Sequence, residues 1–73
     1  MAEVKVFYDH EGKTLTVWFS NPTCEYVSEE TVEEVVLMKD GAGHVIGFEK
    51  LNFSVARPEA LSVALETVPA AGQ

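Results

Sequence analysis

The chain has 73 residues, and its 12 acidic and 5 basic residues give a formal net charge of −7 at pH 7. At this length it forms one domain, and folding buries only about 60% of the surface that the unfolded chain exposes. Cys24 is the only cysteine, so an internal disulfide is excluded, and no Cys/His cluster suggests a metal site. We therefore expect self-association to supply the missing stability.

The five basic residues are dispersed along the sequence, whereas direct binding of nucleic acid requires clustered lysine and arginine. We expect no nucleic-acid ligand. The acidity is typical of a small protein kept soluble by its charge, or of one that binds a basic partner protein. No stretch approaches the roughly 20 apolar residues that span a bilayer, so we expect no membrane association. The free thiol and the absence of a secretory signal predict a cytoplasmic location.

The first two predicted elements form a β-hairpin. Residues 3–9, EVKVFYD, are rich in β-branched and aromatic side chains, and residues 14–19, TLTVWF, alternate in polarity. The alternation places Trp18 on the side away from Leu15 and Val17, together with Phe7. An outward tryptophan of this kind is typical of an anchor under a neighbouring element or subunit.

The middle of the chain is ambiguous. Pro22 predicts a loop or irregular edge over residues 20–27, because proline cannot donate to a central ladder. Ser28 has the chemistry of a helix N-cap, followed by valines at helical spacing. The run VVLM is short and rich in β-branched residues, which favours a strand over residues 34–39. A helical turn within residues 28–38 stays an open alternative.

The stretch GAGHVIG does not match a phosphate-binding loop, because its glycine spacing is wrong and a strand follows instead of a helix. Residues 40–43 predict a tight turn in which Gly41 or Gly43 supplies a positive φ. The fourth strand follows, over residues 44–53, HVIGFEKLNF. Gly47 inside it predicts a bulge or a close approach by another backbone.

The C-terminal part predicts a helix over about residues 58–68. Pro58 fits the first turn of a helix, and a stripe follows at helical spacing, formed by Leu61, Ala64, Leu65 and Val68. Such a short helix forms only when docked. Pro69 ends it, and residues 69–73 are expected to fray.

No motif of an enzyme emerges from the sequence, so we expect no catalytic residue, no cofactor and no metal ligand. An acidic segment is the candidate surface for a basic partner protein: Glu25, Glu29, Glu30, Glu33 and Glu34. Apolar residues on the side that one helix leaves uncovered are the candidates for self-association: Phe7, Trp18, Val36, Met38 and Gly47.

The order of motifs resembles that of the small bacterial proteins known as domain of unknown function 2283. The resemblance rests on YDHEGKTLTVWFS, a Glu-rich segment and VVLMKDGAGHVIGFEKLNFS, over about residues 6–54. It implies a compact antiparallel sheet with no established activity. Some relatives lie beside toxin-like genes, which makes an antitoxin-like role a hypothesis. The chain departs from the pattern at Glu33-Glu34, at Trp18 and in its C-terminal tail.

Together these features predict a single α+β domain over residues 1–73: a four-stranded antiparallel meander within residues 3–53, with the C-terminal helix packed on one face. The expected function is that of a non-catalytic interaction module that binds or neutralises a basic protein. The alternative is a structural homo-oligomer without a separate partner. In either case we expect a homodimer or larger assembly.

Overall fold

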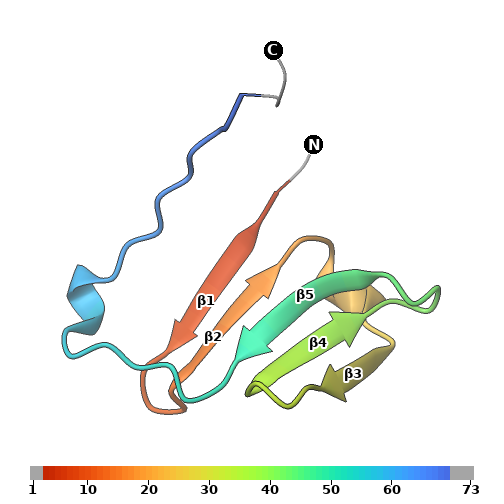
Figure 1. Cartoon of the computed structure of the whole chain (residues 1–73), viewed down its shortest axis with the longest axis horizontal. Helices are drawn as coiled ribbons and strands as arrows, with labels where there is room; N and C mark the ends of the chain where they lie inside the picture. Colours follow the sequence, from red (N-terminus) through yellow and green to blue (C-terminus); the bar gives the residue numbers. More distant parts are fainter. Residues whose placement is uncertain (1–2, 70–73) are drawn as a thin grey trace.

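The computed structural model describes residues 3–69. They form one five-stranded antiparallel sheet with the strand order β1-β2-β5-β4-β3 (Figure 1). Two short 3₁₀ helices lie outside the sheet. The elements are β1 (Lys5–Asp9), β2 (Thr14–Trp18), η1 (Pro22–Cys24), β3 (Val27–Glu30), β4 (Val35–Lys39), β5 (Val45–Lys50) and η2 (Pro58–Ala60).

The predicted first hairpin is confirmed, together with its two-sided pattern. Tyr8 lies opposite Leu15 on one face of the sheet, and Phe7 lies opposite Thr16 on the other. Asp9 stabilises the connecting turn, because its carboxylate accepts a hydrogen bond from the Gly12 N–H at 2.9 Å. The residue types in these two strands therefore specify both their pairing and their register.

The predicted four-stranded meander is wrong. The sheet has a fifth strand, β3, and β5 inserts between β2 and β4. β3 was not predicted because its sequence, VSEE, is polar, and all four of its residues are exposed on the edge of the sheet. β5 is the central strand, and two of its residues that point to opposite faces, Ile46 and Gly47, are both buried.

The predicted C-terminal helix is also wrong, so the fold is all-β instead of α+β. Pro58 begins only the single turn of η2, which ends when the Leu61 N–H donates to the Pro58 carbonyl. Residues 61–69 have no regular secondary structure, and Figure 1 shows them on the β1 side, outside the sheet. The stripe could not form a helix because about eleven residues require docking, and β-branched residues such as Val63 lower the helix propensity. The expected frayed tail lies, apart from Pro69, outside the described residues.

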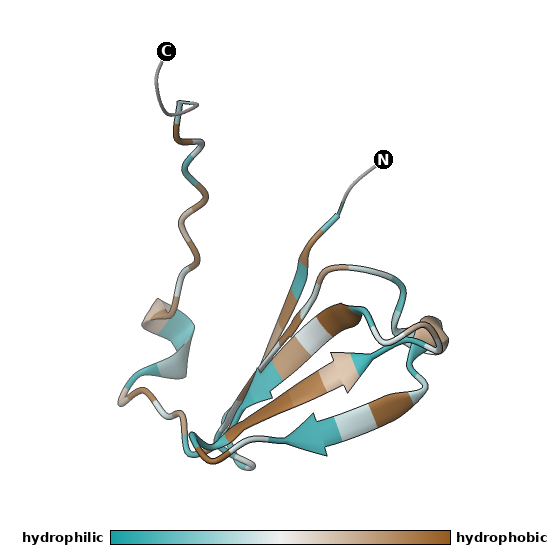
Figure 2. Ribbon diagram, turned by 45° about the vertical axis from the view of Figure 1, so that its right-hand side comes forward, coloured by the Kyte–Doolittle hydropathy of each residue, from teal (hydrophilic) through white to brown (hydrophobic). Residues whose placement is uncertain are grey.

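The sheet is a single layer. Within residues 3–69, extensive contacts between elements join only strands that are neighbours in the sheet. Met38 and Ile46 are the only apolar side chains in this part of the chain that are buried. Figure 2 shows apolar residues recurring along the strands and along the C-terminal segment. Since soluble domains normally bury such residues between two packed layers, this sheet lacks its second layer.

The dimensions of the chain agree with an open sheet. Its accessible surface is 5879 Å², whereas a compact monomer of 8.0 kDa exposes about 4,450 Å². Its radius of gyration is 14.2 Å, against about 11 Å for a compact domain of this length. Roughly 1,400 Å² of surface that a folded chain normally buries is therefore exposed to water.

Candidate interaction surface

The register of the strands assigns every side chain of the sheet to one of two faces. We call the first the tyrosine face; its central residues are Val6, Tyr8, Leu15, Val17, Leu37 and Phe48. We call the second the tryptophan face; it contains Phe7, Trp18, Val36, Met38 and Gly47. The structure thus brings together all five residues that the sequence suggested for self-association. Whether they mediate self-association stays a prediction.

The tryptophan face is built around Gly47. Trp18 and Met38 lie opposite this glycine on the two neighbouring strands. A Cβ at position 47 would lie 2.6 Å from the Val17 carbonyl oxygen and 2.9 Å from Cε3 of Trp18. The predicted close approach by another backbone is confirmed, because the Val17 carbonyl oxygen leaves no room for a Cβ at this position. Glycine therefore fits beneath the side chains of Trp18 and Met38. A shift of register between Met38 and Lys39 also lies beside it.

The tyrosine face carries a continuous apolar row across four strands. Val6, Val17, Phe48 and Leu37 lie opposite one another in turn, from β1 to β4. Phe19 extends the row, with its ring centroid 6.0 Å from that of Phe48. The sequence did not identify these residues as a binding surface because the predicted helix was expected to cover one face. The alternation in β2 was the signal that they share a face.

Tyr8 anchors the chain that follows β5. Its ring meets Phe53 edge to face at a centroid distance of 5.8 Å, and its hydroxyl accepts a hydrogen bond from the Val55 N–H at 3.1 Å. The Phe53 N–H also donates to the Lys13 carbonyl in the β1–β2 turn at 2.8 Å. These contacts carry the chain past the first hairpin, so the C-terminal segment begins on the β1 side of the sheet (Figure 1).

The five candidate glutamates do not form one acidic patch. Glu29 and Glu30 are neighbours on β3, so their side chains point to opposite faces of the sheet. Glu29 pairs with Lys39 at 3.1 Å, and Glu34 pairs with Lys50 at 3.6 Å.

The other glutamates take up separate places around β3. Glu25 accepts a hydrogen bond from the Ser28 hydroxyl, and Glu33 lies in the turn between β3 and β4. Lysines therefore partly neutralise the surface that the sequence suggested for a basic partner.

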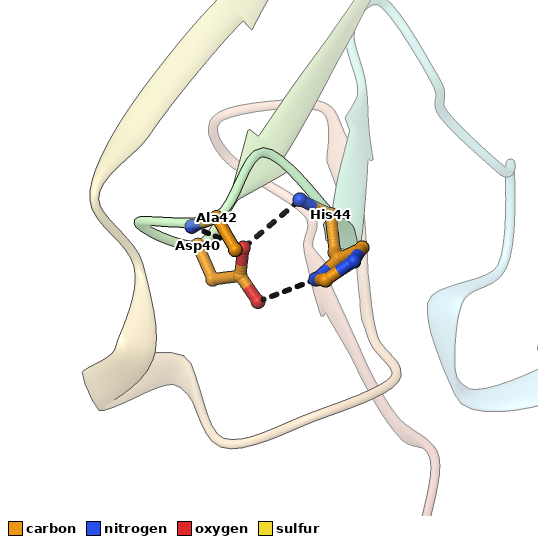
Figure 3. A network of polar contacts seen from close by, with 3 residues as sticks. All are labelled: Asp40, Ala42 and His44. Atoms are coloured by element: carbon orange, nitrogen blue, oxygen red, sulfur yellow. Dashed lines mark hydrogen bonds and ion pairs between the residues drawn. The ribbon is translucent and has the colours of Figure 1, made fainter.

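Asp40 organises the glycine-containing turn between β4 and β5 (Figure 3). Its Oδ1 accepts hydrogen bonds from the Ala42 and His44 N–H groups at 3.0 and 2.9 Å, and its Oδ2 lies 3.4 Å from Nδ1 of His44. The hydrogen bond from the His44 backbone is the main cause that lowers the pKa of Asp40 below its ordinary value. Gly43 has a φ of 88°, as the predicted turn requires. These polar groups satisfy one another within the turn.

The remaining side chains that could bind a metal ion or react do not cluster. Across residues 3–69, no three His, Cys, Asp or Glu side chains gather in a way that could hold a metal ion. Cys24 is exposed at the end of η1. No helix in the described part of the chain is long and apolar enough to cross a membrane. The surfaces with a capacity to bind are therefore the two apolar faces and the open edges of the sheet.

The fold and these surfaces define a class: a small protein made of one antiparallel sheet. The chain belongs to the family described as protein of unknown function DUF2283, whose model matches residues 5–54. This confirms the family resemblance of the sequence. The match covers all five strands and ends before η2, so the C-terminal segment lies outside it. Comparisons with curated proteins and with solved structures give no match.

Proposed function

We propose that this protein is a non-catalytic interaction module whose sheet packs, through the tyrosine face, on a second copy of the chain. The single observation that supports it best is the lack of a second layer, with only Met38 and Ile46 buried among the apolar side chains of residues 3–69. A sheet that exposes apolar residues to water on both faces is stabilised by burying one face against another polypeptide.

The exposed surface has the size that a stable dimer requires. A typical specific interface buries about 800 Å² on each partner, and permanent homodimers bury more. The chain exposes roughly 1,400 Å² more than a compact monomer of its mass. Packing two sheets face to face would bury part of this excess, with the inner side chains interdigitating. The extended C-terminal segment also contributes to the excess, since Leu65 and Val68 are almost fully exposed.

The tyrosine face is the better candidate of the two. Its row Val6–Val17–Phe48–Leu37 is continuous, and none of the four side chains is fully buried. Each face has one buried apolar side chain, Met38 on the tryptophan face and Ile46 on the tyrosine face. The tryptophan face has no comparable apolar row, because Glu49 lies between Thr16 and Val36. Self-association through the tryptophan face is the alternative.

Two substitutions on β2 separate these alternatives. Val17 and Thr16 are adjacent, half-buried residues on opposite faces of the same strand. We expect Val17→Lys to raise the dimer dissociation constant by at least about tenfold, because a charge replaces a buried apolar contact. Thr16→Lys serves as the matched control and should leave the constant nearly unchanged. Sedimentation equilibrium gives the constants, and circular dichroism verifies that both variants keep the sheet.

The opposite pattern, in which Thr16→Lys dissociates the dimer and Val17→Lys does not, would place the interface on the tryptophan face. Equal constants for both variants and the wild type would contradict packing through either face.

A basic partner protein, neutralised as an antitoxin neutralises its target, is a second candidate function. The net charge of −7 favours it, as do Glu30 and Glu33 on the exposed end of the sheet. Charge reversal by Glu30→Lys and Glu33→Lys should abolish capture of such a partner from a native lysate. Unchanged capture would remove this candidate, and recovery of the chain alone would favour a homo-oligomer without a separate partner.

A further inference from the structure

We propose that residues 61–69 are a sixth strand, which each chain donates to the β1 edge of a second copy. The inference rests on the proposed self-association and names a contact that completes it. The family match supports treating this segment as an addition, because all five strands lie within residues 5–54 and the segment does not.

The segment has the sequence pattern of a strand, and its first residue has an extended backbone. Leu61, Val63 and Leu65 alternate with Ser62, Ala64 and Glu66, which is the period of a half-buried strand. The backbone is extended at Leu61, with φ −70° and ψ 133°. Leu65 is 93% exposed and Val68 is 81% exposed, so their apolar surface is free to be covered by another chain.

β1 is the more receptive of the two edges of the sheet. β3 is only four residues long and carries Glu29 and Glu30, and short, charged edge strands resist pairing. β1 carries Val6, Phe7 and Tyr8 at its centre, and Phe7 is 55% exposed. One side of its backbone has no neighbouring strand in the sheet and offers its N–H and C=O groups for pairing.

One antiparallel register between the segment and β1 places apolar residues side by side on the tyrosine face and opposite charges side by side on the tryptophan face. If Glu66 lies opposite Lys5, then Leu65 lies opposite Val6 and Val63 lies opposite Tyr8. The two apolar residues then extend the tyrosine face by one strand, and the carboxylate of Glu66 meets the ammonium of Lys5. Register, hydrophobic pattern and charge therefore agree on one alignment.

The donor is assigned to a second copy because the segment does not pair with its own β1. In Figure 1 it lies on the β1 side without joining the sheet, and Leu65 remains almost fully exposed. Exchange of identical elements between two protomers is a low-cost route to a dimer. The excess of exposed surface, roughly 1,400 Å², is large enough to accommodate both the exchanged strands and the packed faces.

A first experiment compares two substitutions in the full-length chain. Leu65→Asp removes the central apolar residue of the segment, and Val32→Asp is the matched control, because Val32 is 95% exposed and lies in the β3–β4 turn. We expect Leu65→Asp to raise the dimer dissociation constant by at least about tenfold and Val32→Asp to leave it within a few-fold of the wild type. Equal constants for the two variants would overturn the sixth strand.

A second experiment shows which chain receives the segment. In a Cys24→Ala background, Val6→Cys and Leu65→Cys place thiols on residues that the register brings face to face. Oxidised glutathione should then link two chains, which denaturing electrophoresis without reductant detects as a covalent dimer. The control pair, Val6→Cys with Ala64→Cys, places the thiols on opposite faces and should crosslink poorly. A bond within one chain, no bond, or equal yields for the two pairs would overturn the exchange.

The two proposals fail in different ways. A wild-type chain that stays monomeric contradicts the proposed self-association, and the strand exchange with it. A dimer that is weakened by Val17→Lys and is unaffected by Leu65→Asp keeps the proposed function and overturns the strand exchange alone.

Discussion

At the residue scale, Gly47 shows how a single missing side chain positions two others. Trp18 and Met38 lie opposite it on neighbouring strands, and a Cβ at this position would come within 2.6 Å of the Val17 carbonyl oxygen. The ring of Trp18 can shift, whereas the carbonyl belongs to a strand that is paired on both sides. The glycine is therefore required by the backbone as well as by the covering side chains.

Replacement of Gly47 by alanine should lower the free energy of unfolding by about 1–3 kcal/mol, because the added methyl group overpacks the centre of the sheet. Gly41→Ala is the matched control, since nothing lies within 4 Å of the Cβ that it would add. Urea unfolding measures both variants. Equal losses of stability at the two positions would contradict the packing role of Gly47.

The protonation of Asp40 makes the stability of the folded state depend on pH. Its backbone hydrogen bond from His44 lowers its pKa below the ordinary value of 3.8, so the folded state favours the charged carboxylate. A group with a lowered pKa contributes stability above its unfolded pKa, and this contribution is lost as the pH falls through the folded pKa.

The stabilising effect of the charged Asp40 should therefore disappear in acid. Asp40→Asn should destabilise the protein at about pH 6, and the difference from the wild type should shrink as the pH falls below 3.8. Urea unfolding of both proteins over this range gives the difference at each pH, and the effects of the other carboxylates cancel. A difference that does not change with pH would contradict the role of the carboxylate charge.

At the element scale, β3 protects one edge of the sheet while β1 leaves the other edge open. Glu29 and Glu30 oppose the addition of a further strand to β3, because an incoming chain would have to accommodate both charges. β1 has charged residues only near its ends, at Lys5 and Asp9. In the proposed assembly, this difference between the edges would limit strand addition to the β1 side of the sheet.

Removal of the charges on β3 should allow larger assemblies to form. We expect Glu29→Val with Glu30→Val to produce oligomers beyond the dimer in sedimentation velocity, because β3 becomes an apolar edge. The pair Glu25→Val and Glu33→Val changes the net charge equally and lies outside β3, so it should leave the size distribution unchanged. Similar oligomers from both pairs would assign the effect to net charge alone.

The sequence predicted those elements whose local residue pattern is compatible with only one conformation. The alternation in TLTVWF, the turn residues Asp40 and Gly43, and the mid-strand Gly47 each led to the observed local structure. β3 was missed because an edge strand is solvated on its outer side and needs no apolar pattern. The C-terminal stripe was read as a helix because its apolar residues fit both a helical and an extended period.

At the scale of the whole molecule, the strand order could not be predicted from local patterns. β5 lies between β2 and β4, and this order depends on pairing between residues far apart in the sequence. The absence of the predicted helix over residues 58–68 changes the exposed surface of the sheet more than the strand order does. Without this helix, the tyrosine face is uncovered as well as the tryptophan face, and these exposed apolar residues are the basis of the proposed self-association.

The central claim is that a second copy of the chain completes this sheet. Sedimentation equilibrium of the full-length wild-type protein, at tens of micromolar, tests it most directly. We predict a mass of twice 8.0 kDa, with dissociation to the monomer only on strong dilution. A mass of 8.0 kDa at this concentration, with the sheet intact by circular dichroism, would contradict the claim.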